Sequence, residues 1–452
     1  MMILDNSMLE KMEEYVEKHK EEIIGTLRKL VEIPSVRGEE TADAPYGEAS
    51  LEILKESIKL FDGKEYSGRL AKSRKYAVIE CGNGDKTIGM FAHGDVVAAT
   101  GEWIYGKPFE LTELDGLLIG RGSEDDKAGI VQMLYASKML KELGVPVKSR
   151  LMFFVGGNEE DGMGDLIDFT ENEKMPDVSF VIDGEYPYYA AEKSRTCALL
   201  KNTGKFENIS NIYGGKCFNI VLDELNVEYK NGKREVIYGK ASHAAEPEKS
   251  ENALVKFAKD ADSNPDLSEN DRKILKETYN ILADYNGKGL GIASYDENFG
   301  ALTAVNGVVK TVDGHLTVSL DMRHSLVPAE TVIDTIKHNT EGVWEVEQTF
   351  HSDGCLVDEK TPLAAAVRRA CGAVSEKLNK MGEITGGATY ARFLKNSFSI
   401  GISVDHGDKK SILKKGHGNI HGPDEAVSVR GLLDAVKILA AIIIETDRVI
   451  SE

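Results

Sequence analysis

Three apolar runs in this sequence are each followed closely by a histidine or by carboxylates, and this pattern strongly constrains the fold. The residues concerned are His93 after residues 88–92, Glu159 and Glu160 after 150–155, and Asp183 after 178–182. Continuous apolar runs of this length are typical of strands buried on both faces of a parallel sheet. In open α/β sheets, ligands bind at the carboxyl ends of the strands. The sequence therefore predicts that these side chains meet at one edge of a mostly parallel sheet.

A metal site follows from the charges gathered at that edge. Asp125 lies at the start of a helix predicted over residues 127–143 and adds a further carboxylate. Several carboxylates in a partly desolvated site repel one another, and divalent cations bound by oxygen and imidazole ligands remove that repulsion. Adjacent glutamates suit two tasks, since one can bind a metal while the other removes a proton from water. Asp95 is placed to accept the second imidazole N–H of His93.

The domain organisation follows from a change of pattern near residue 188. Strands alternate with helices before that point, which predicts an α/β domain with a mostly parallel sheet. Residues 189–350 contain short strand-like runs interleaved with helical stretches, which predicts an inserted α+β domain with an antiparallel sheet. The expected strands are 218–227, 302–309 and 316–322, and the expected helix is 269–285. Candidate ligands lie on both sides of the insertion, so residues 1–188 and 351–452 are expected to form one catalytic domain.

Composition excludes several classes of protein. The chain has 452 residues and a net charge of -20, which argues against nucleic acid or an anionic membrane as a partner. Its five cysteines include no CxxC pair, so free thiols are expected rather than disulfides or a cysteine zinc site. The longest apolar stretch, 435–444, is too short to span a bilayer. Residues 1–11 lack the apolar core of a signal peptide, and a cytoplasmic protein is expected.

Together these motifs resemble the zinc aminoacylase/carboxypeptidase family of co-catalytic metallopeptidases. The resemblance extends from Leu30–Val36 to the motif His421–Glu425, which is nearly the whole chain. It implies a dinuclear metal site of two divalent ions, with zinc favoured and manganese or cobalt as alternatives. The implied metal ligands are His93 and Asp183 for one ion, Glu160 and His421 for the other, and Asp125 as the bridge. The resemblance also implies a cis peptide bond between Asp125 and Asp126.

The same resemblance assigns the remaining roles. Glu159 is the implied general base, and Asp95 orients His93. The insertion corresponds to a lid domain, in which His243 stabilises the oxyanion while Asn219 and Arg323 contact the substrate. The glycine-rich segment 386–392 resembles one that closes over the substrate. Its candidate contacts are Gly387 and Arg392.

The long insertion and the Gly-Gly-Ala-Thr-Tyr-Ala-Arg segment are similar to those of the dipeptidase V branch. That likeness implies a monomeric dipeptidase acting on a small peptide. Departures from the family pattern, Ala98 and Lys127–Gly129, affect no implied ligand. One alternative is a deacylase of the same family, such as a succinyl-diaminopimelate desuccinylase or an N-acyl-amino-acid hydrolase. A second alternative is a non-catalytic binding protein that retains the fold.

Overall fold

The computed structural model describes residues 4–451, so the ends of the expected catalytic domain, residues 1–3 and 452, lie outside the described residues. The chain divides into two compact units. The first comprises Met1–Ala190, Val357–Glu383 and Thr389–Glu452, and the second comprises Ala191–Leu356 and Ile384–Ala388. The sequence places the boundaries within a few residues of 190 and 357, but it assigns 384–388 to the catalytic domain. That short segment instead groups with the second unit.

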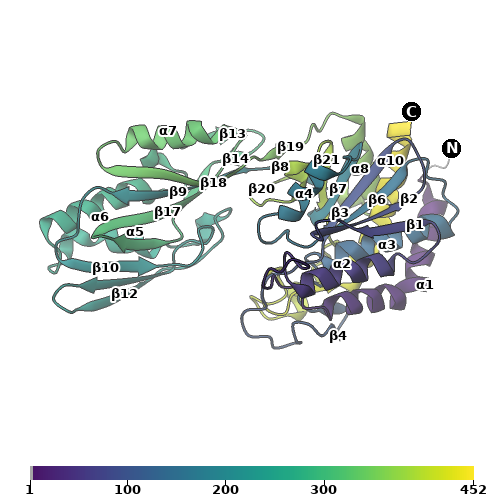
Figure 1. The fold of residues 1–452 in the computed structure, drawn as a ribbon, viewed down its shortest axis with the longest axis horizontal. Coiled ribbons are helices and arrows are strands. Elements are labelled where there is room, and N and C mark those ends of the chain that lie inside the picture. Colours follow the sequence, from purple (N-terminus) through teal and green to yellow (C-terminus); the bar gives the residue numbers. More distant parts are fainter. Residues whose placement is uncertain (1–3, 452) are drawn as a thin grey trace. The chain divides into compact units, whose positions relative to one another are not determined.

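The first unit is built on a mixed, largely parallel sheet (Figure 1). Its strands run in the order β1-β2-β6-β3-β7-β21. Their bounds are β1 Tyr66–Leu70, β2 Tyr76–Cys81, β6 Arg150–Gly156, β3 Thr87–His93, β7 Val178–Gly184 and β21 Ser397–Gly401. Strands β6, β3, β7 and β21 are parallel neighbours, whereas β1 and β2 pair antiparallel. The four parallel strands therefore end at one edge of the sheet.

Helices cover both faces of this sheet, because its strands are apolar on both sides. One face packs on α1 (Asn6–Val31), α2 (Glu48–Leu60), α3 (Lys127–Glu142), α8 (Pro362–Val374) and α10 (Val429–Ser451), which share one large core. The other face carries aromatic rings that contact Phe169 of α4 (Gly164–Asn172) edge to face. The purple N-terminal and yellow C-terminal helices pack together in this unit (Figure 1).

A small antiparallel sheet joins two loops of the first unit. It contains β4 (Thr112–Leu114), β5 (Leu117–Ile119) and β22 (Ala426–Ser428) in the order β22-β5-β4. β5 leads into the segment that carries Asp125, and β22 follows the loop that carries His421. The pairing of β5 with β22 therefore brings together two segments about 300 residues apart in the sequence.

The second unit contains an antiparallel sheet in the order β12-β11-β10-β16-β17-β9-β18, with β15 also paired to β17. The strands are β9 Ser194–Asn202, β10 Ile209–Gly214, β11 Glu224–Tyr229, β12 Arg234–Tyr238, β15 Thr303–Val305, β16 Val309–Val312, β17 His315–His324 and β18 Trp344–Ser352. Helices α5 (Ala253–Lys259), α6 (Glu269–Leu282) and α7 (Ala329–Asn339) share its core. The predicted fold class, an α/β domain with an inserted α+β domain, is confirmed.

Shorter elements complete the chain. The remaining strands have two to four residues. They are β8 Tyr189–Glu192 with its partners β19 Cys355–Leu356 and β20 Glu383–Thr385, and the pair β13 Tyr295–Asp296 and β14 Gly300–Ala301. The short helices are η1 Pro247–Lys249, η2 Ala261–Ser263, η3 Lys288–Leu290, η4 Glu376–Leu378, η5 Tyr390–Phe393 and α9 Asp408–Ile412. No helix within residues 4–451 combines the length and apolarity that crossing a bilayer requires.

The strand expected over 218–227 is wrong in its first half. Regular pairing begins only at Glu224, and residues 218–220 form a loop. A Cβ at Gly307 would lie within 2.6 Å of the carbonyl oxygens of Cys217, Phe218 and Ile220. This loop is thus packed tightly against another backbone segment, an arrangement that hydrophobic periodicity does not reveal.

Candidate active site

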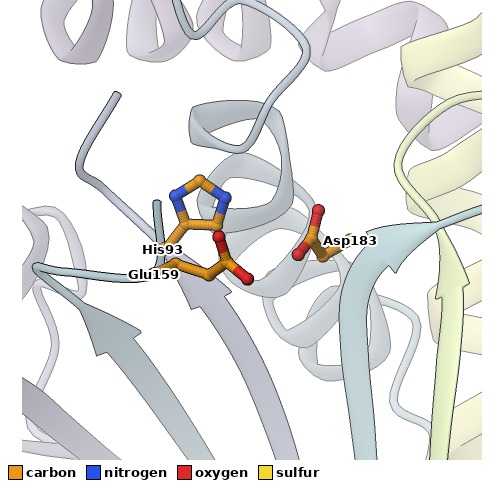
Figure 2. Close-up of side chains that lie close together, drawn as sticks. All are labelled: His93, Glu159 and Asp183. Carbon is orange, nitrogen blue, oxygen red and sulfur yellow. The ribbon is translucent and has the colours of Figure 1, made fainter. Parts of the chain in front are cut away.

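The first group of polar side chains lies at the carboxyl ends of β3, β6 and β7. Figure 2 shows His93, Glu159 and Asp183 gathered around one space, and a ligand atom from each lies within 4.8 Å of the others. The strand register explains this, because His93 pairs with Gly156 and β7 runs parallel on the other side of β3. The structure therefore brings together the side chains that the apolar runs place at one edge.

A second group shares His93 and adds Asp125 and Glu160, again with ligand atoms within 4.8 Å of one another. Oδ1 of Asp125 is 3.0 Å from Nε2 of His93, and Oδ2 is 2.9 Å from Nε2 of His421. The same Nε2 of His421 is 3.0 Å from Oε1 of Glu160. The Asp125 carboxylate thus presents one oxygen to each imidazole, as a carboxylate shared by two metal ions would. The peptide bond from Asp125 to Asp126 is cis, as the resemblance implies.

The electrostatics of these groups favour bound cations. His93 is fully buried, and Asp125 is only 6% exposed. Burial raises the pKa of Glu160, and the charge of Asp125 raises it further. Burial lowers the pKa of His421, but its hydrogen bonds to Asp125 and Glu160 outweigh that effect and raise the pKa to about 10. The buried carboxylates therefore hold positive charge close to them, and two imidazoles with three carboxylates suit two divalent ions such as zinc.

Glu159 differs from the other carboxylates of the group. Its Oε1 atom is buried and has no hydrogen-bond partner among residues 4–451. Burial, followed by the negative charge of Asp183, raises the pKa of Glu159 well above its usual value. Burying a carboxylate oxygen without a hydrogen-bond partner destabilises the fold, unless a ligand or a water molecule donates a hydrogen bond to it. These properties fit a group that accepts a proton rather than one that only stabilises the fold.

Asp95 positions both the histidine and the two glutamates. Its backbone carbonyl lies 3.0 Å from Nδ1 of His93, whereas its carboxylate Oδ1 is 3.5 Å from that atom. The carboxylate instead accepts hydrogen bonds from the backbone N–H groups of Glu159, at 3.0 Å, and Glu160, at 3.1 Å. The sequence led us to expect the Asp95 carboxylate as the partner of the imidazole, but the Asp95 carbonyl lies closer to it. The carboxylate fixes the loop that carries both glutamates.

Glu425 is a positioning residue that sequence reasoning missed. Its Oε1 accepts hydrogen bonds from the backbone N–H groups of Gly122, Glu124 and Asp125 at 3.0–3.1 Å. Its Oε2 accepts one from the buried guanidinium of Arg121. Glu425 lies four residues after His421, so one side chain clamps the Asp125 segment to the loop of the second histidine. The only signal in the sequence is its place at the end of the His421–Glu425 motif.

Two further carboxylates fix the loops around these ligands. Asp126 accepts a hydrogen bond from the backbone N–H of His93 at 3.1 Å and caps α3 through Gly129 N–H at 3.2 Å. Asp165 accepts hydrogen bonds from the Asn158 N–H at 2.8 Å and from the Tyr390 hydroxyl at 2.6 Å. The segments that carry His93, Asp125, Glu159 and Glu160 are therefore tied to neighbouring elements by hydrogen bonds.

The second unit brings together His243 and Asn219. Their segments pair through a bridge between Ile220 and His243, and Ala244 N–H donates to the Asn219 carbonyl at 2.9 Å. Nδ1 of His243 lies 3.2 Å from the N–H of Ala245 and accepts its hydrogen bond. This contact places the ring proton of the neutral imidazole on Nε2, so that Nε2 is a hydrogen-bond donor. His243 is exposed.

Arg323 lies beside the glycine-rich segment in the same unit. Its guanidinium is 3% exposed and donates to both oxygens of Asp321 and, at 2.7 Å, to the carbonyl of Gly386. These contacts use three of its five N–H groups, which leaves two for a ligand. Gly387 N–H donates to the Thr385 hydroxyl at 2.9 Å. Arg392, the other candidate anchor, lies in η5 of the first unit and is partly exposed.

Comparison with known proteins identifies the family. A model of the peptidase family M20/M25/M40 matches residues 89–445, which is more than half of the chain. YtjP of Bacillus subtilis strain 168, named "Putative dipeptidase YtjP", is 25% identical over 468 residues, covering 95% of this chain and 98% of YtjP.

Solved structures share the fold at low identity. Dug1p of Saccharomyces cerevisiae, described as a di-peptidase, has a TM-score of 0.61 at 12% identity and covers 97% of this chain and 98% of its own. The YXEP protein of Bacillus subtilis, described as a dinuclear metal binding peptidase, has a TM-score of 0.51 at 11% identity. The match covers 95% of this chain and 98% of the YXEP chain. The chain belongs to the M20/M25/M40 peptidase family and is a hydrolytic enzyme of the metallopeptidase class. The family resemblance and the enzyme class inferred from the sequence are both confirmed.

Proposed function

We propose that this enzyme is a dipeptidase that hydrolyses the amide bond of a small peptide at a site for two divalent metal ions. The observation that carries the proposal is the Asp125 carboxylate held between the Nε2 atoms of His93 and His421, with the unpartnered Glu159 oxygen in the same group of side chains. The names of YtjP and Dug1p support dipeptides as substrates, and the description of the YXEP protein supports two metals.

In this proposal His93 and Asp183 hold one ion, Glu160 and His421 hold the other, and Asp125 bridges them. Bound divalent ions lower the pKa of water to about 7 and polarise a carbonyl group. The donor set suits zinc, and manganese or cobalt ions take the same oxygen and nitrogen ligands. The protein's own contribution is to hold these ligands at fixed positions through Asp95, Asp126 and Glu425.

Glu159 is the proposed general base. Its buried Oε1 accepts a proton from the attacking water, and the raised pKa of Glu159 favours this transfer. The same carboxyl group then gives the proton to the amine that leaves. Glu159 can do this because Asp95 holds its backbone N–H and leaves its side chain facing His93 and Asp183.

His243, Asn219 and Arg323 of the second unit, and Arg392 of the first, are proposed to bind the rest of the substrate. Nε2–H of His243 donates a hydrogen bond to the oxyanion of the tetrahedral intermediate. Asn219, in the loop that pairs with His243 through the Ile220 bridge, contacts the same end of the substrate. Arg323 or Arg392 binds the C-terminal carboxylate, for which a guanidinium is well suited. Gly387 offers backbone close to that carboxylate, because its neighbour Gly386 already accepts a hydrogen bond from Arg323.

The insertion also favours one branch of the family. Its length and the Gly-Gly-Ala-Thr-Tyr-Ala-Arg segment favour the dipeptidase V branch, and with it a monomer. The remaining alternative within the family is a deacylase that acts on N-succinyl or N-acetyl amino acids. Both activities need the same metal ligands and base, so the site itself does not separate them.

A substrate panel tests the proposal. The purified chain, loaded with zinc, manganese or cobalt, is assayed on dipeptides and on N-succinyl and N-acetyl amino acids, and its bound metal is counted. We expect two metal ions per chain and a kcat/KM for dipeptides at least 100-fold above that for the acylated amino acids. Faster hydrolysis of an acylated amino acid would replace the dipeptidase assignment with the deacylase.

A further inference from the structure

A cavity of about 590 Å³ lies in the first unit, with Asp183 in its wall. The segment 402–420 forms most of the remaining lining, together with Glu124 and Glu185. Pockets of a few hundred cubic ångströms suit small ligands. The cavity therefore adjoins the metal ligands and is large enough for part of a peptide.

The lining segment is tied to the metal ligands at both ends. It begins after β21, where Gly401 pairs with Gly184 of β7, the strand that carries Asp183. It ends at residue 420, directly before His421. Because both of its ends are fixed at ligand-bearing positions, the segment is held next to the proposed reaction centre.

The cavity is lined by an unusual concentration of positive charge. Four lysines, Lys409, Lys410, Lys414 and Lys415, line it within seven residues of a chain whose net charge is -20. Among residues 4–451, Lys409 alone of the four has an acidic partner, since its Nζ lies 2.6 Å from Oε2 of Glu124. The other Glu124 oxygen accepts a hydrogen bond from Ser403 at 2.9 Å. Glu124 is thus fully engaged and does not neutralise a second lysine.

The other three lysines, Lys410, Lys414 and Lys415, are exposed. None of them forms an ion pair within 4.0 Å with any residue in the range 4–451. Two more carboxylates, Glu185 and Asp405, line the cavity without pairing to these lysines. The lining therefore offers unpaired ammonium groups on one segment and a carboxylate, Glu185, two residues from Asp183.

We propose that this cavity binds the N-terminal residue of the dipeptide and that Lys410, Lys414 and Lys415 select an acidic side chain there. The inference rests on the proposed dipeptidase function. The scissile carbonyl belongs to the N-terminal residue, so the side chain of that residue must lie within a few bonds of the metal ligands, next to Asp183. An aspartate or glutamate at this position carries a carboxylate for the lysines and an α-ammonium for Glu185. A solvated lysine surface without this role would not distinguish such a substrate from its amide.

The test compares Glu-Ala with Gln-Ala, which differ in charge but hardly in shape, on the metal-loaded full chain. We expect the unmodified enzyme to have a kcat/KM about tenfold higher for Glu-Ala than for Gln-Ala. Several weak ion pairs, each of which raises kcat/KM a few-fold, combine to give this difference. The KM for Glu-Ala should rise with salt while that for Gln-Ala stays constant. Ala-Glu, with the acidic side chain on the other residue, should show no such dependence.

The triple variant K410Q/K414Q/K415Q should lose the preference for Glu-Ala. Its kcat/KM for Glu-Ala should fall about tenfold, whereas its kcat/KM for Gln-Ala should stay within about twofold of the unmodified value. A matched control, K11Q/K64Q/K72Q, removes three exposed lysines of the same unit that lie outside the cavity lining. It should leave the kcat/KM for both substrates unchanged. Equal hydrolysis of Glu-Ala and Gln-Ala by the unmodified enzyme would overturn the subsite while leaving the dipeptidase assignment intact. Equal losses on both substrates in the triple variant would also overturn it. If neither dipeptide were hydrolysed, the proposed function itself would fail.

Discussion

Two proposed metal ligands of the first unit, His93 and Asp125, differ from His243 of the second unit in their surroundings. His93 and Asp125 are buried, and Asp126 and Glu425 fix their segments through backbone hydrogen bonds. Asp95 fixes the segment of Glu159 in the same way. His243 is exposed, and its segment pairs with the segment of Asn219 through the bridge to Ile220. Metal binding requires positions fixed to a fraction of an ångström, whereas a residue that acts on the substrate can tolerate more freedom. We therefore expect His93 and Asp125 to determine metal content, whereas His243 should affect turnover without changing the metal content.

Removing the Asp125 carboxylate, the proposed bridge, is expected to have the largest effect of the variants below. In Asp125→Ala both imidazoles lose the group they share, so we expect loss of at least one metal ion per chain and a fall in activity of more than about 1,000-fold. Metal counting after exhaustive dialysis and an activity assay measure this. Full metal content in the variant would show that Asp125 is not a bridge.

A change in the second unit should separate turnover from metal content. His243→Ala removes the proposed donor to the oxyanion, and we expect kcat to fall about 100-fold to 1,000-fold. The metal content should stay at two ions per chain, because His243 lies in the other unit. Parallel loss of metal and activity would contradict the difference between the two regions.

A smaller effect is expected at Glu425, which binds no metal itself. Glu425→Gln keeps the size of the side chain but weakens its bonds to three backbone N–H groups and to Arg121, so metal affinity should fall about 10-fold to 100-fold. Competition with a chelator measures the affinity. The matched control Glu102→Gln alters an exposed glutamate of the same unit and should leave the affinity unchanged. An unchanged affinity in Glu425→Gln would remove its positioning role.

The smallest effect is expected at Tyr390. Tyr390→Phe keeps the aromatic packing on Phe154 but removes the hydroxyl that donates to Asp165. We expect a loss of about 1–2 kcal/mol in the free energy of unfolding, because a buried hydrogen bond disappears. Urea unfolding of the metal-loaded protein gives this value. A loss of metal ions without a loss of stability would instead place Tyr390 within the metal-binding network.

The sequence predicted the parts of the site that depend on strand order and strand ends. His93 and Asp183 directly follow apolar runs and Glu159 follows one closely, and parallel strands necessarily end at one edge. The roles of Glu425 and of the Asp95 carboxylate could not be predicted in this way, because both act on backbone N–H groups whose positions depend on tertiary contacts. Hydrophobic periodicity likewise gave no sign of β10 and β12, whose residues are largely exposed or half-buried. The first half of the strand expected over 218–227 is a loop packed tightly against Gly307, which periodicity does not reveal either.

Glu159→Gln tests the central claim most directly, since it asks whether the unpartnered carboxylate beside the metal ligands is the base. The variant keeps the shape of the side chain and every proposed metal ligand. We predict two metal ions per chain, as in the unmodified enzyme, with a kcat for dipeptide hydrolysis at least about 100-fold lower. Near-normal turnover in a fully metal-loaded Glu159→Gln protein would contradict the account.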